Sequence, residues 1–189
     1  MDRYGVESGK AVLKLAHYYI GRIESDRQNW ENARIHFDKS IEVDPNFVDG
    51  FLSLGQAVYH RAVFEDRLQK ELRRRLLRAA VRRFGEAQEA IGRNYEELKD
   101  ASKGLDLIRG RLVYKGGSFR THLREYNSVL WAKTAGIHYW LGKALIALGE
   151  EPEALESFRR ATKLAPDVAI YREAEAMLGQ RVDQPSDEK

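Results

Sequence analysis

The side chains that most often carry catalysis or bind metal ions are scarce and scattered in this sequence. There are no cysteines, which excludes disulfides, thiolate metal sites and a thiol nucleophile. Five histidines are present, but no two are four residues apart, the spacing with which a helix presents a ligand pair to zinc. The run from Gly5 to Lys10 has one residue too few for a phosphate-binding loop and follows no predicted strand. We therefore predict no enzymatic activity, no cofactor and no metal site.

A basic run between residues 61 and 83 is the strongest charge feature of the chain. It holds nine basic and three acidic side chains, whereas the whole chain carries a net charge of only +3, so the remainder is slightly acidic. Such a surface can meet an acidic protein, nucleic acid phosphates or anionic lipid. However, the i,i+4 pairs Asp66–Lys70 and Glu71–Arg75 are typical of a solvated helix face. The candidate basic surface consists of Arg67, Lys70, Arg74, Arg78 and Arg82.

The composition indicates which elements must position these residues. Charged residues make up 32% of the chain and proline occurs only four times, which favours helices throughout and an all-α fold. No stretch approaches the ~20 apolar residues that span a bilayer, and the N-terminus lacks the apolar core of a signal peptide. We expect a cytoplasmic protein, with the periplasm as the alternative that the absence of cysteine leaves open.

Five residues recur at matching intervals in two parts of the chain that lie 121 residues apart. The intervals suit two antiparallel helices, because glycine on the first and alanine on the second allow a close approach. A phenylalanine fills the space between helix pairs, and a proline ends the second helix. The matching residues are Gly21 and Gly142, Ala33 and Ala154, Phe37 and Phe158, Ser40 and Ala161, and Pro45 and Pro166.

This pattern resembles the tetratricopeptide repeat, a 34-residue helix–turn–helix unit whose copies stack into a right-handed superhelix. The resemblance places one copy at 14–47 and another at 135–168. A third, stretched copy with elongated helices is expected at 48–94, where Gly55 repeats the start of the unit and Phe84 its second half. The resemblance therefore implies an all-α, right-handed α–α solenoid.

The other segments do not match the motif. Residues 95–134 are predicted to form an irregular helical hairpin inserted in the array, and 167–179 a helix that caps its C-terminal end. Together, 1–179 are expected to form a single domain, and 180–189 a disordered tail.

In the family that the chain resembles, the first helix of each repeat lines a concave groove that holds a peptide or helix of another protein. Aromatic side chains and cations in such positions suit peptide binding. An alternative interpretation is that several of these aromatics pack against the inserted hairpin. Carried over to this sequence, the groove residues are Tyr18, Tyr19, Arg22, Leu52, Ser53, Gln56, Tyr59, Tyr139, Trp140 and Lys143.

The resemblance thus implies a non-catalytic scaffold or adaptor whose partner is another protein. Two alternatives stay open: a module for homo-oligomeric assembly, and a module that binds nucleic acid or an acidic partner through residues 61–83. We expect neither nucleic acid nor a membrane to be the main partner, because the basic run also carries apolar positions of a core-facing helix.

Overall fold

The chain folds into a series of helices, as the sequence predicts. The structure is a computed structural model that describes residues 3–108 and 119–183, with side chains described for 8–96 and 129–182. Within these residues there are seven helices and no strand. The helices are α1 (Arg3–Asp26), α2 (Trp30–Val43), α3 (Val48–Phe64), α4 (Lys70–Ile108), α5 (Phe119–Leu148), α6 (Glu151–Leu164) and α7 (Ala169–Asp183).

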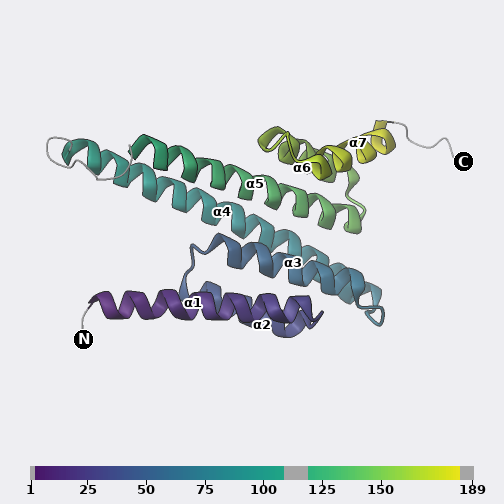
Figure 1. Ribbon diagram of the computed structural model, residues 1–189. Coiled ribbons are helices and arrows are strands. Elements are labelled where there is room, and N and C mark those ends of the chain that lie inside the picture. The colour runs from purple at the N-terminus through teal and green to yellow at the C-terminus, as the bar shows by residue number, and fades with distance from the viewer. Residues whose placement is uncertain (1–2, 109–118, 184–189) are drawn as a thin grey trace, which may run out of the picture.

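Each helix packs chiefly against its neighbours in the chain. The pairs α1–α2, α3–α4 and α5–α6 are joined by contacts of α2 with α3 and of α4 with α5, and α7 lies on α6 (Figure 1). The first helices of neighbouring pairs also touch, α1 with α3 and α3 with α5. This confirms the all-α solenoid of stacked helix pairs.

A glycine of the first helix lies directly against a phenylalanine ring of the second helix in every pair. A Cβ atom added to Gly21 would lie 2.7 Å from the ring of Phe37, and one added to Gly142 would lie 2.6 Å from that of Phe158. The stretched pair has the same contact, since a Cβ atom on Gly55 would lie 2.5 Å from Phe84. Because glycine has no side chain, the ring of the phenylalanine fits directly against the backbone of the facing helix.

The turns inside the first and third pairs are equivalent. Gln28 and Gly149 both have a positive φ, of 61° and 84°, and each lies seven residues after the glycine of its pair. The next residue closes each turn, because the N–H of Asn29 bonds to the carbonyl of Glu24 and that of Glu150 to Leu145, both at 2.9 Å. These bonds satisfy carbonyls at the end of the first helix. The shared geometry holds both pairs antiparallel.

Helices α4 and α5 run across the boundaries that we predicted for an inserted hairpin. Helix α4 continues through Gly92, and α5 begins well before residue 135. The described helical parts of 95–134 are thus the end of α4 and the first half of α5. Gly92 does not end the helix because the next two residues are held against the turn between α2 and α3. Arg93 donates hydrogen bonds to Asn46 and Pro45, and Asn94 donates one to the carbonyl of Asn46. An exposed glycine also costs only about 1 kcal/mol.

The capping helix is also longer than predicted. Helix α7 ends at Asp183, so residues 180–183, which we expected in a disordered tail, are helical. Val182 explains the extension, since it packs against the cluster of Leu155, Phe158 and Leu178. The remaining tail, 184–189, lies outside the described residues.

Candidate partner-binding groove

An aromatic cluster lies where the first helices of the second and third pairs meet. Helix α3 contributes Tyr59 and His60, and α5 contributes Tyr139 and Trp140. The Trp140 ring is 5.8 Å from Tyr59, 5.3 Å from His60 and 5.8 Å from Tyr139 between centroids, each in an edge-to-face arrangement. Such pairs stabilise by about 0.5–1.5 kcal/mol beyond their area. The rings therefore form a preorganised surface.

Lys143 lies against this cluster. Its Nζ atom is 4.5 Å from the centroid of Trp140, 5.5 Å from Tyr59 and 5.7 Å from Tyr139. Burial lowers the pKa of Lys143 below its usual value. No carboxylate pairs with this ammonium group among the described residues. The rings attract the cation but supply no hydrogen-bond acceptor with full charge, so its donors stay available to an anion.

A hollow continues the cluster toward the first pair. It has a volume of about 310 Å³ and lies between α1, α2 and α3. Arg22 and Asp26 line it from α1, and Ser53 and Gln56 from α3. His60 belongs to both the hollow and the aromatic cluster. His60 thus links the hollow to the aromatic cluster, and we take the two together as the candidate groove, with residues from α1, α3 and α5.

Burial sets the protonation of the groove. It lowers the pKa of His60, with a smaller contribution from the charge of Lys143, so this imidazole is neutral at pH 7. Burial also raises the pKa values of Tyr59 and Tyr139, which keeps both phenols protonated. The groove thus offers neutral donors and rings around a lysine.

The structure brings seven of the ten predicted groove residues together in this way and places three differently. Tyr18 packs its ring against Phe37 and Phe47, and Leu52 packs against the same core. Tyr19 is exposed and touches only the Tyr18 ring among the described aromatics. The first helix therefore contributes mainly Arg22 to the groove.

Besides Asp26, which lines the hollow, three ring-bearing groove residues escaped the sequence prediction. Trp30, at the start of α2, contacts His60, with ring centroids 5.2 Å apart. Tyr171 of α7 contacts Tyr139 at 5.1 Å. The sequence could have indicated His60, because it follows the predicted Tyr59. Trp30 and Tyr171 could not be found in this way, because they lie outside the first helices from which the groove residues were chosen.

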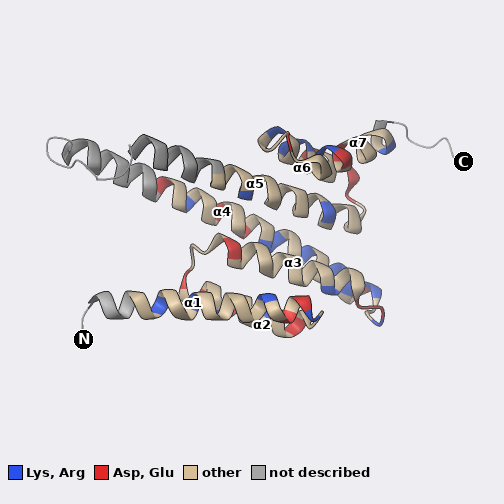
Figure 2. Ribbon diagram, in the orientation of Figure 1, with Lys and Arg blue, Asp and Glu red and all other residues tan. Residues whose placement is uncertain are grey.

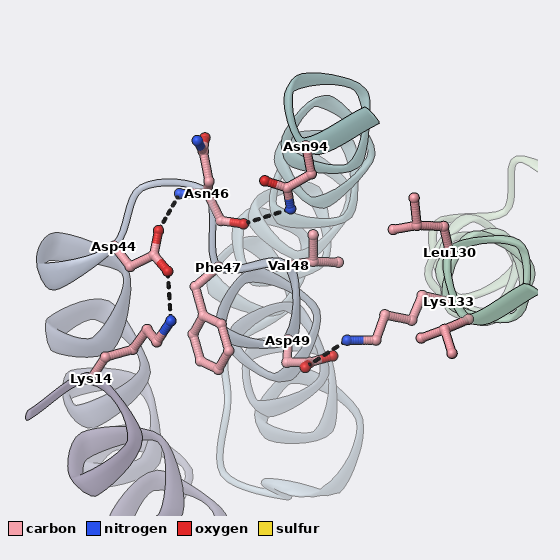
Figure 3. Close-up of a pocket in the computed structure, with 10 residues that line it drawn as sticks. Lys14, Asp44, Asn46, Phe47, Val48, Asp49, Asn94, Leu130 and Lys133 are labelled. Carbon is pink, nitrogen blue, oxygen red and sulfur yellow. Dashed lines mark hydrogen bonds and ion pairs between the residues drawn. The ribbon is translucent and has the colours of Figure 1, made fainter. Parts of the chain in front are cut away.

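A second hollow lies at the turn between α2 and α3 and has a volume of about 370 Å³ (Figure 3). One lysine of α1 and one of α5 line it, and each is paired with a carboxylate. Lys14 pairs with Asp44 and Lys133 with Asp49, each at 2.7 Å. Asn94 donates a hydrogen bond to the carbonyl of Asn46. These contacts hold α1, α4 and α5 against the turn between α2 and α3 and the start of α3. The hollow therefore lies where the helix pairs meet, and its role there is structural.

The basic surface gathers near the turn from α3 to α4, where Figure 2 shows several blue segments. All five of its predicted residues are exposed. Only Arg82 has an acid nearby among the described side chains, Glu86 at 3.8 Å. The cations at the start of α4 also oppose the helix dipole, which favours acidic residues there. Helix stability therefore does not explain this charge.

The described residues contain no group of three or more side chains suited to a metal ion. None of the described helices combines the length and apolar character needed to cross a bilayer.

Stacked helix pairs with a side-chain-lined groove define the chain as a helical-repeat solenoid. Residues 135–168, which comprise the second part of α5 and all of α6, match the family model of the tetratricopeptide repeat. No curated protein matches the chain. Residues 135–168 thus form a repeat of the tetratricopeptide type, and repeats of this type generally mediate contacts between proteins.

Proposed function

We propose that this protein is a non-catalytic scaffold that holds a segment of another protein in the groove across α1, α3 and α5. The observation that carries the proposal is Lys143, a half-buried ammonium group set among three aromatic rings without a carboxylate partner in the described residues.

The groove chemistry favours a segment with one acidic and one large apolar side chain. A carboxylate would form a charge-assisted hydrogen bond with Lys143, the stronger kind of hydrogen bond. The apolar side chain would lie on the half-buried rings of Trp140 and Tyr139, which offer area at low entropic cost. Because stacked helices fix the groove beforehand, the partner segment bears most of the ordering cost.

A display selection of random peptides on the whole protein tests the proposal. Enriched peptides are synthesised and their affinity is measured by fluorescence anisotropy. Lys143→Met removes the charge and keeps the bulk of the side chain, and should weaken binding about 10- to 100-fold, the equivalent of a lost hydrogen bond to a charged group. The matched control is Lys133→Met, on the same helix but paired with Asp49 outside the groove, and it should bind as the parent does.

Two results would overturn the proposal. One is a selection that enriches no peptide above background. The other is a set of peptides that bind Lys143→Met and the parent protein equally well, which would place the contact elsewhere on the chain.

A further inference from the structure

The outer face of α1 is apolar and lies open to solvent. Six large apolar side chains on this helix are exposed, by between 39% for Ile20 and 68% for Val12. Between them, α1 has a single exposed charge, Arg22. We call these residues the α1 stripe; they are Val12, Leu13, Leu15, Tyr19, Ile20 and Ile23.

Contacts within the first pair do not explain the α1 stripe. Helix α1 packs against α2 through another set of residues, with Gly21 against Phe37 and Lys14 paired with Asp44. It lies along the edge of the molecule, and no described helix covers its outer side (Figure 1). At the opposite end, α7 covers the array and buries Leu178 beside Leu155. Among the described residues, no helix covers the outer side of α1 in the way that α7 covers α6.

The exposed area is sufficient for a specific pairing. Aromatic side chains bury about 150–250 Å² each, and the aliphatic ones that make up most of the α1 stripe bury less. At roughly 170 Å² each and about half exposed, six side chains give about 500 Å² per copy. Two such faces bury roughly 1,000 Å² together, which is the area that a specific interface with good complementarity should clear. A single small ligand would leave most of this area in water.

The order of residues along α1 matches itself in reverse. When two α1 helices lie antiparallel with the twofold axis between His17 and Tyr18, residues equally far from the axis face each other. This places Ile23 opposite Val12, and Ile20 opposite Leu15. Leu13 lies opposite Arg22, whose methylene stem can pack on the leucine while its guanidinium group stays in water. It also places the largest ring of the α1 stripe, Tyr19, opposite the small Ala16, which provides the room that interdigitation needs.

We propose that the α1 stripe is an isologous interface through which two copies of this chain pair antiparallel along α1. A twofold pair uses the same surface twice and leaves no open end, so it closes as a dimer. The dimer carries two grooves, and a partner with two binding segments would gain affinity through effective concentration without any new contact.

A bilayer surface fits the α1 stripe less well than a second copy does. Helices that lie in a membrane interface are rich in lysine and arginine along the border of their apolar face. Here Lys10 lies toward α2, where it lines a small hollow with Asp44, and Arg27 pairs with Glu24. The other exposed charges beside the described part of the α1 stripe are Arg22 and Asp26, one of each sign.

Molecular mass in solution tests the dimer. The full chain should sediment as a dimer at micromolar concentrations, and Ile23→Glu should halve the mass while keeping the helical circular dichroism signal. The matched control is Ile170→Glu on α7, since Ile170 is about as exposed as Ile23, and this variant should stay dimeric. A parent chain that is monomeric throughout this range, or a dimeric Ile23→Glu variant, would overturn the proposal. So would a monomer that binds vesicles of phosphatidylcholine and phosphatidylglycerol through the α1 stripe.

The register has its own test, because the chain contains no cysteine. The double variant Val12→Cys with Ile23→Cys should form a covalent dimer under mild oxidation. The two positions lie roughly 16 Å apart along one helix, so they cannot bridge within a copy. Failure of this variant to cross-link, or equal cross-linking of Val12→Cys alone, would rule out the antiparallel register.

Discussion

At the residue scale, the glycine of each helix pair has a packing role that alanine cannot fill. The rings of Phe37, Phe84 and Phe158 are fully buried or nearly so, and each lies on the glycine of its own pair. The ring has no free volume into which it can withdraw, since protein interiors are close-packed. A single methyl group at these positions must therefore move a helix.

This predicts opposite effects of the same substitution at two glycines. Gly55→Ala places a methyl group 2.5 Å from the Phe84 ring and should destabilise the fold by about 1–3 kcal/mol, as overpacking does. Gly85→Ala on α4 has nothing within 4 Å and should stabilise by up to about 1 kcal/mol through helix propensity. Urea unfolding followed by circular dichroism measures both, and a similar change in the two variants would contradict the packing role of Gly55.

At the element scale, the local motif predicted the helix pairs well but not the lengths of the helices. Gly21, Phe37 and their equivalents meet within one pair, so their spacing in the sequence reports the crossing directly. The continuity of α4 depends instead on its contacts with the turn between α2 and α3. Gly92 indicated an end to the helix, yet the hydrogen bonds of Arg93 and Asn94 to this turn outweigh a small local propensity.

The sequence likewise predicted individual residues of the candidate groove but not how they come together. Tyr59, Tyr139, Trp140 and Lys143 lie close to the glycines of the motif, so their position follows from the repeat. Their convergence on one cluster depends on how α3 and α5 pack together, which no spacing within one repeat reports. Tyr171 reaches the cluster only because α7 folds back over α6.

The contact between α4 and α5 predicts a dependence of stability on pH. His138 lies 3.2 Å from the Gln88 amide nitrogen through its Nδ1 atom. Burial, and then the charge of Arg160, lower the pKa of His138 from the model-compound value of 6.5, while Glu156 opposes the shift. As the pH falls through 6.5, His138 therefore takes up a proton in the unfolded chain before it does so in the folded protein.

Stability should decrease as the pH falls from about 7.5 through 6.5, because proton uptake in this range favours the unfolded state. His138→Asn should reduce this decrease, and His36 and His60, whose pKa values are also lowered, should account for part of the remainder. Free energies of unfolding in urea at several pH values measure the slope. The same slope in His138→Asn and the parent would show that His138 does not contribute.

At the scale of the whole molecule, a stack in which helices contact mainly their chain neighbours should open from its ends rather than all at once. Stability in such arrays is close to a sum of unit and interface terms. The contact between the glycine and the phenylalanine of each pair then determines the stability of that pair locally.

Replacing the phenylalanine of the first helix pair or that of the third pair by alanine should therefore affect opposite ends of the molecule. Phe158→Ala, which should cost about 3–5 kcal/mol locally, should accelerate amide hydrogen exchange in α5–α7 and leave α1 and α2 protected. Phe37→Ala should show the reverse pattern. Hydrogen exchange read by mass spectrometry resolves the two regions, and uniform acceleration across all helices in either variant would indicate one cooperative unit instead.

The position of Lys143 also determines which partners the groove rejects. Aromatic rings arranged around a point are a common means of capturing a methylated amine or another soft cation. Here the chain's own ammonium group already occupies that place, 4.5 Å from the Trp140 centroid. An incoming cation would have to displace a tethered competitor of the same charge, so segments rich in lysine are discriminated against before any favourable contact forms.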